Sequence, residues 1–212
     1  MLLADDFYCV AHDDLTGRAR LHSRGLGLGL AGALLGELVL CDGLAVREGE
    51  LWVTDPWAAP EALAAQTLAQ IDTYVQHRKV ATWLAYLAQS AAPMVAQRLR
   101  AAGILERVEF RTLGGLGPQR SAYRPRNVNT MAWRPVRLAG QLTGPDPIGP
   151  ADVLLAGLVA ATGLLPTVLW QPEQRGPGEA RFAAEVGELH PSLRDLLACV
   201  EAAVGAAVLA PR

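Results

Sequence analysis

The sequence predicts a mainly α-helical protein: a globular helical domain around one buried central helix, with short β-hairpins on its surface. Hydrophobic residues make up 51% of the 212 residues but aromatic residues only 6%, so the core must be aliphatic, as is typical of helical domains. Residues 25–44 carry no charge before Glu37, yet their apolar run is too short for a membrane span. We therefore expect a single domain, residues 1–212, with this segment as its innermost helix.

The first half of the chain alternates apolar runs with turn signals, and the apolar residues recur at helical spacing. The elements predicted in this half are a helix at 2–11, a strand at 18–22, the central helix, a β-hairpin with strands at 44–47 and 50–53, and helices beginning at Pro60, Val80 and Pro93. In the last of these helices we expect Val95 and Leu99 to face inward, while Arg98 and Arg100 face elsewhere.

The second half begins with an alternating segment, which is typical of a β-strand, and then returns to helices. Its predicted elements are a hairpin with strands at 104–112 and 121–126, helices at 130–142 and 151–162, a glycine- and proline-rich surface stretch at 171–178, and two terminal helices. We expect the last helix, 192–209, to pack against the central helix, because it carries almost no charge.

The central helix contains a literal G-x-G-x-x-G motif, from Gly27 to Gly32. A dinucleotide-binding fingerprint also requires a parallel β-α-β context, whereas a hairpin and several consecutive helices follow here. Each glycine inside a helix costs about 1 kcal/mol relative to alanine, so these glycines must serve a purpose. We expect them to allow close packing of neighbouring helices, most clearly at Gly32-x₃-Gly36.

The net charge of −2 hides a strong asymmetry along the chain. Residues 98–137 contain nine arginines and two glutamates, while the segments before and after have net charges of −5 and −4. This pattern predicts a positive face on the molecule. Eighteen of the 19 cationic residues are arginine, which we attribute to a GC-rich bacterial genome.

The sequence shows no motif typical of a metalloprotease, a serine hydrolase, a P-loop or a zinc site, and its four histidines are scattered. We therefore expect no enzyme activity, no cofactor and no metal. Cys9, Cys41 and Cys199 lie far apart in apolar surroundings, which predicts buried free thiols in a reducing compartment. Because the N-terminus lacks a secretory pattern, we expect a cytoplasmic protein.

Several short motifs occur in an order that is informative as a set. The central helix contains Leu30-x-Gly32-x-x-Leu35-x-Glu37-Leu38, and a later helix-to-strand junction has the sequence Gly103-Ile104-Leu105. Between them come Thr67-Leu68-Ala69-Gln70-Ile71 and Val80-Ala81-Thr82-Trp83-Leu84. With these motifs in this order over nearly the whole chain, the sequence resembles the Golgi phosphoprotein 3 family.

The resemblance implies a mostly α-helical domain and a non-catalytic function. Eukaryotic members are peripheral membrane proteins that recognise phosphatidylinositol 4-phosphate and hold glycosyltransferases in the Golgi through their cytosolic tails. Their protruding hairpin helps oligomerisation and membrane contact. The resemblance therefore implies an adaptor that binds anionic phospholipid headgroups at the inner face of a membrane, with a client protein and a second copy of the chain as further partners. The hairpin residues that match are Arg107, Arg111, Leu113, Leu116, Arg120 and Arg124.

The headgroup pocket of the family contains a tryptophan and three arginines. By alignment, these positions hold His22, Ala31, Gln89 and Ala92 in this chain. Nearby arginines offer guanidinium groups that suit phosphate oxygens. The headgroup-binding residues predicted from this alignment are His22, Arg20, Arg24, Arg98 and Arg100.

Three different functions also fit parts of the same sequence. The helix ending near Arg100 and the arginine-rich hairpin after it are similar to a winged helix, which predicts salt-dependent DNA binding. We nevertheless expect no nucleic-acid partner, because the flanking segments are acidic and the helix offers few base-reading side chains. The second possible function is that of a dinucleotide-dependent enzyme that uses residues 27–32. The third is that of an oligomeric scaffold whose arginines pair with acids of a neighbouring subunit.

Overall fold

The central helix of the computed structural model is α2 (Ser23–Leu40), and the structure describes residues 2–111 and 119–209. The ring of His22 caps the start of α2, and glycine at 43 follows its end. By length and composition alone α2 could cross a membrane, but 78% of it is buried inside the protein. This burial confirms the expectation of an innermost helix.

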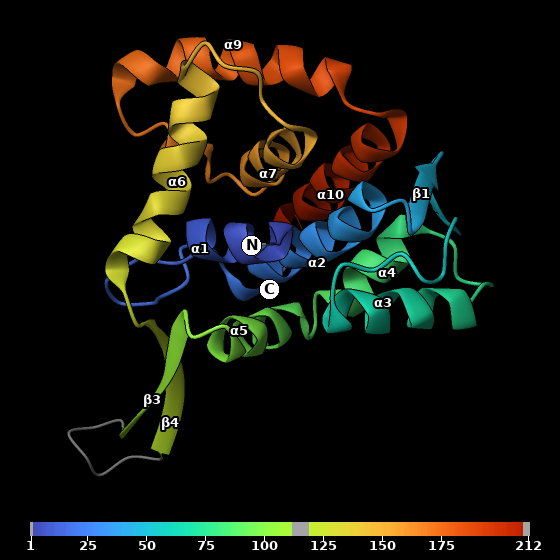
Figure 1. Ribbon diagram of the computed structural model, residues 1–212, viewed down its shortest axis with the longest axis horizontal. Helices are drawn as coiled ribbons and strands as arrows, with labels where there is room; N and C mark the ends of the chain where they lie inside the picture. The colour runs from blue at the N-terminus through green and yellow to red at the C-terminus, as the bar shows by residue number, and fades with distance from the viewer. Residues whose placement is uncertain (1, 112–118, 210–212) are drawn as a thin grey trace.

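Other helices surround α2 on two sides (Figure 1). On one side lie α1 (Leu3–Ala11), α7 (Pro150–Ala161) and α10 (Pro191–Leu209), and on the other α3 (Ala62–Thr73), α4 (Val80–Leu87) and α5 (Ala91–Ala101). An outer layer contains α6 (Val128–Thr143) and α9 (Pro172–Glu188), with the short α8 (Leu165–Val168) beside them. The mainly α-helical fold predicted from composition is therefore confirmed.

Close helix packing explains the glycines of α2. A side chain at Gly27 would overlap the backbone carbonyl of Ala88, and one at Gly32 would lie 2.6 Å from Val200 of α10. A methyl group at Gly36 would likewise lie 2.7 Å from Leu154 of α7. The dinucleotide hypothesis is wrong, because this segment is enclosed by helices and the sheets among the described residues are two antiparallel pairs.

Both predicted hairpins are present. Strands β1 (Leu44–Arg47) and β2 (Glu50–Val53) pair around a turn in which Glu48 and Gly49 both have positive φ angles. Strands β3 (Leu105–Arg111) and β4 (Gln119–Pro125) pair from Leu105–Pro125 to Arg111–Gln119. The second hairpin extends away from the helical body, and its base contacts α5 and α6 (Figure 1).

Three local expectations are wrong. Residues 18–22 form no strand, because Ala19 makes a single bridge to His12 before the chain enters α2. The surface stretch 171–178 does not precede the first of the two terminal helices but begins it: Pro172 occupies the favoured first helical position of α9, and Gly178 packs against Leu169. Cys41 and Cys199 are only partly buried, whereas Cys9 is fully buried as predicted.

Candidate functional site

The N-terminus of α2 carries two of the predicted headgroup residues. His22 and Arg24 are both exposed, and the His22 ring accepts a hydrogen bond from the Arg24 backbone N–H at 3.4 Å. Arg24 lines a hollow of about 530 Å³ between α2, α4 and α10. Gln89, one of the positions that match the family pocket, lines the same hollow. The other lining residues are Ser23, Leu28, Ala81, Ala85, Ala88 and Ala203, so Arg24 is its charged residue.

Arg98 lies in the interior, and the expectation that it faces away from the core is wrong. Its side chain is 12% exposed and lies within 3.0 Å of three carboxylates. Nε donates to Asp5 at 2.8 Å, Nη1 donates to Glu61 at 2.8 Å, and both terminal nitrogens donate to Glu37. Four of the five N–H donors of a guanidinium are therefore engaged by protein carboxylates.

The carboxylates around Arg98 differ in their surroundings. Glu37 is the most enclosed, and burial raises its pKa despite hydrogen bonds from Arg98 and from the Ala4 backbone N–H. Glu61 caps the start of α3 by accepting from two backbone N–H groups, and these bonds lower its pKa although partial burial opposes them. The N-termini of α1 and α3 thus help Arg98 to stabilise negative charge.

A second, partly buried cluster joins α1, α6 and α7. Arg134 lies 3.0 Å from Asp6, and Arg137 donates to both oxygens of Asp152, at 3.0 and 2.6 Å. Gln141 donates to the same Asp152 carboxylate at 2.7 Å. Burial raises the pKa of Asp6, although both arginines oppose this shift. This cluster holds helices together and leaves its charges balanced.

The predicted headgroup residues do not form one pocket. Arg98 pairs with Glu37, which lies 13 residues beyond Arg24 on α2, so these sites are roughly 20 Å apart along the helix axis. Arg20 pairs with Asp13 and Asp14 at 3.6 and 3.8 Å. Arg100 is exposed in the last turn of α5, shortly before β3 of the second hairpin begins. The fold therefore keeps His22 and Arg24 together, pairs Arg20 with nearby acids, and places Arg98 and Arg100 on another helix.

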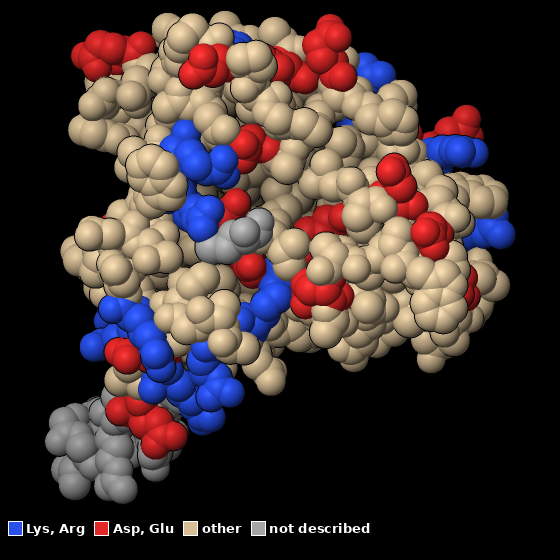
Figure 2. Space-filling model, in the orientation of Figure 1, with Lys and Arg blue, Asp and Glu red and all other residues tan. Residues whose placement is uncertain are grey.

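The basic block of residues 98–137 is divided by the fold. Three of its arginines pair with acids elsewhere in the chain, as described above. Others gather where β3 and β4 leave the helical body, and Figure 2 shows positive side chains concentrated there. We call this group the hairpin-base cluster; its exposed members are Arg100, Arg107, Arg124 and Arg126.

The turn before α2 adds a further cation to this cluster. Gly17 contacts the Tyr123 carbonyl of β4 so closely that a side chain there would overlap it. Arg18, the next residue, is exposed, so this contact brings its backbone close to that of Arg124. Two glutamates moderate the charge: Glu106 lies opposite Arg124 in the register, and Glu109 lies 3.9 Å from Arg107.

The remaining predicted hairpin residues are only partly visible. Arg111 and Arg120 belong to β3 and β4, but their side chains are not among those described. Leu113 and Leu116 lie outside the described residues. Their predicted membrane contact therefore stays a prediction.

A family model described as Golgi phosphoprotein 3 (GPP34) matches residues 3–208, which is nearly the whole chain. The chain belongs to the Golgi phosphoprotein 3 family. A search of curated proteins found no match. As a Golgi phosphoprotein 3 family member, the protein has a buried glycine-rich helix, and the described arginines of its basic block divide between two clusters paired with acids and one surface cluster.

The sequence analysis did not predict the two clusters in which arginines pair with acids, although isolated acids in apolar helices indicated them. Asp5 and Asp6 lie in an otherwise apolar helix, and Glu37 is an isolated acid near the end of another. A carboxylate in such a position is costly to bury unless a cation accompanies it. Each of these acids therefore indicated an arginine partner from another part of the chain.

Proposed function

We propose that this protein is a peripheral, non-catalytic adaptor that attaches to anionic phospholipid surfaces through the hairpin-base cluster. The observation that carries the proposal is the concentration of exposed arginines around the base of the second hairpin. Arg107 and Arg124 lie on opposite faces of the paired strands and Arg126 follows β4, while Arg100 precedes β3 and Arg18 follows the glycine that contacts β4. Guanidinium groups form paired hydrogen bonds with phosphate oxygens, which suits lipid headgroups. Family membership supports the same function. Arg98 does not belong to the proposed site, because its guanidinium is buried among carboxylates.

The expected strength of attachment is modest. Each basic residue close to an anionic membrane contributes about 1 kcal/mol, so five arginines supply on the order of 5 kcal/mol before repulsion and the nearby glutamates are considered. Such an energy corresponds to a dissociation constant of roughly 0.1–1 mM. Attachment of this strength is reversible, and it would be reinforced by oligomerisation or by contacts of the hairpin with the membrane.

Sedimentation with vesicles tests the proposal. We expect the protein to sediment with phosphatidylcholine vesicles that contain phosphatidylglycerol, and more so than with phosphatidylcholine alone. Binding should weaken as salt shortens the screening length from about 30 Å at 0.01 M to about 8 Å at 0.15 M. The double variant Arg100→Glu with Arg124→Glu should lose most of the gain from the anionic lipid.

A matched control is Arg47→Glu. Arg47 is exposed on β1, on the opposite side of the helical body from the second hairpin. This variant should bind anionic vesicles almost as the wild type does. Equal binding of the wild type to neutral and anionic vesicles would overturn the proposal, and salt-sensitive binding to duplex DNA without any vesicle binding would favour the winged-helix function.

A further inference from the structure

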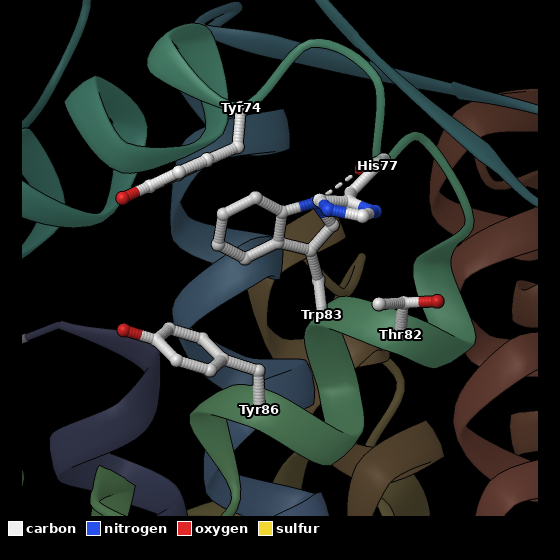
Figure 3. Close-up of a pocket in the computed structure, with 5 residues that line it drawn as sticks. All are labelled: Tyr74, His77, Thr82, Trp83 and Tyr86. Carbon is white, nitrogen blue, oxygen red and sulfur yellow. Dashed lines mark hydrogen bonds between the residues drawn. The ribbon is translucent and has the colours of Figure 1, made fainter.

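A concave site lined by aromatic side chains lies between the end of α3 and α4, and none of its described lining residues belongs to an arginine cluster (Figure 3). It has a volume of about 320 Å³ and is lined by Tyr74, His77, Thr82, Trp83 and Tyr86. Tyr74 ends α3, and Trp83 and Tyr86 come from α4. We call this site the aromatic pocket.

The rings of the aromatic pocket are arranged around a fixed indole. Trp83 is almost completely buried and donates its Nε1–H to the His77 carbonyl at 2.5 Å, which sets the orientation of the ring. Tyr86 meets Trp83 edge to face, with ring centroids 5.7 Å apart. Figure 3 shows Tyr74 and Tyr86 on opposite sides of the indole, so the two tyrosines form walls beside it.

The backbone around the pocket is held in place before any ligand arrives. The His77 N–H donates to the Tyr74 carbonyl at 2.9 Å, so the chain turns tightly after α3. The Arg78 carbonyl then accepts from Leu51 of β2 at 2.7 Å, and Val80 N–H donates to Gly49 at 2.9 Å. A pre-formed site loses little conformational freedom on binding.

The chemistry of the lining favours a cation without strong hydrogen-bonding needs. The described lining residues include no lysine, arginine or carboxylate, while the half-exposed rings of Tyr74 and Tyr86 and the small exposed part of the Trp83 indole line the space. The nearest arginine in the sequence, Arg78, does not fill the pocket, because its guanidinium lies over the ring of Trp52 at 4.0 Å. That contact also shows that a cation on an aromatic face is favourable at this end of the molecule.

We propose that Tyr74, Trp83 and Tyr86 form an aromatic cage for a quaternary ammonium group. Such a group binds aromatic faces through charge while it needs no hydrogen-bond partner, and groups of aromatic rings are its characteristic receptors. The volume is at the small end of ligand sites, which range from about 300 to 1,000 Å³, and this suits a choline-sized group. The source of the trimethylammonium group is either a free small molecule or the headgroup of phosphatidylcholine.

Titrations in solution test the cage. Indole N–H signals are followed by nuclear magnetic resonance while tetramethylammonium chloride or choline chloride is added at constant ionic strength. We expect a saturable shift of the Trp83 signal. The neutral isostere 3,3-dimethylbutan-1-ol has the shape of choline without its charge, and it should bind roughly 2- to 30-fold more weakly.

Variants distinguish binding by an aromatic cage from nonspecific binding to an apolar surface. Tyr86→Ala and Tyr74→Ala should each weaken choline binding several-fold, because each removes one wall, whereas Tyr86→Phe keeps the ring and should retain binding. Both tyrosines are about half exposed, so these variants should fold, as thermal unfolding would verify. Trp57→Ala is the matched control, since Trp57 is 90% exposed and lies outside the pocket lining.

Three results would overturn the cage: no saturable shift of Trp83, equal binding of the neutral alcohol, or full affinity in Tyr86→Ala. Sedimentation with pure phosphatidylcholine vesicles that free choline competes away would identify the lipid as the source. Choline binding without such sedimentation would identify a free molecule. Because the tyrosine variants leave the hairpin-base cluster intact, failure of the cage is distinguishable from failure of anionic-lipid binding.

Discussion

Arg98 and Glu37 form a two-point contact in which Nη2 lies 3.0 Å from Oε1 and Nη1 lies 3.1 Å from Oε2. The pair connects α5 to α2, and the same guanidinium reaches α1 through Asp5 and the start of α3 through Glu61. One side chain therefore links four helices. Arginine suits this position because its planar fork binds carboxylates through two parallel hydrogen bonds, which a lysine ammonium cannot do.

Replacing Arg98 with methionine should strongly destabilise the protein. The change leaves three carboxylates without their shared cation, and removing one member of a buried ion pair costs about 3–5 kcal/mol. Urea unfolding would measure the loss. Arg98→Lys should recover only part of it, while Arg100→Met, at an exposed position on the same helix, should stay within about 0.5 kcal/mol of the wild type. Equal stability of the two methionine variants would contradict the role of Arg98.

Gly27→Ala should also destabilise the protein, because the new methyl group would overlap the Ala88 carbonyl and force α2 away from the end of α4. Overpacking of this kind typically costs about 1–3 kcal/mol. Gly205→Ala in α10 is the matched control, since no atom lies within 4 Å of the added group. At position 205, the better helix propensity of alanine should raise the melting temperature and increase the free energy of unfolding by up to about 1 kcal/mol. If Gly27→Ala instead stabilised the protein, α2 and the end of α4 would be packed less closely than the structure indicates.

The stability of the protein should fall between pH 6.5 and pH 4 in part because of His12. This ring is buried and stacks on Tyr8 with centroids 3.8 Å apart, and burial lowers its pKa to about 4 although a bond to the Tyr8 carbonyl opposes the shift. The unfolded chain binds a proton near the ordinary pKa of 6.5, so protonation favours unfolding. The contribution of neutral His12 is complete above pH 6.5 and is lost as the pH falls towards 4, by roughly 3 kcal/mol at most.

Chemical unfolding at a series of pH values would check this expectation. His12→Gln should be less stable than the wild type at neutral pH but should show a flatter pH dependence between 6.5 and 4. The same slope in both proteins would assign the acid sensitivity to other groups.

Gly17→Ala should weaken binding to anionic vesicles. Gly17 has a φ of 68° and touches the Tyr123 carbonyl, so an alanine would be strained and would push the turn away from β4. Gly103 has a similar φ of 74°, but no atom lies within 4 Å of an added methyl group. Gly103→Ala therefore carries the same backbone strain without the clash. Vesicle binding that falls only in Gly17→Ala would assign the effect to the displacement of Arg18, and equal binding would remove Arg18 from the cluster.

Much of the fold could be predicted because it follows from local patterns. The uncharged run before Glu37 and the glycine spacing indicated a buried helix packed closely by others, and the structure contains that helix. Local sequence patterns predicted the wrong secondary structure where contacts with neighbouring segments determine it. The stretch 171–178 has the composition of a loop, but Pro172 is a favourable start for a helix and Gly178 gains a contact with Leu169.

The candidate site was harder to predict, because the sequence gives the number of arginines and not their partners. Arg98 and Arg100 are two positions apart on one helix, yet one pairs with two buried acids and the partly buried Glu61, and the other is exposed. The difference depends on Asp5, Glu37 and Glu61, which are distant in the chain. The aromatic pocket was missed because Tyr74 and Tyr86 line one site only when the chain turns between the end of α3 and α4.

The second hairpin joins the helical body chiefly at its base, through α5 and α6. Substitutions along the outer parts of β3 and β4 therefore leave the packing around α2 unchanged. Under the proposed function, a lineage could therefore change the surface that the hairpin binds and keep the same folded core. The hairpin is accordingly the natural place to transplant new specificities onto this scaffold.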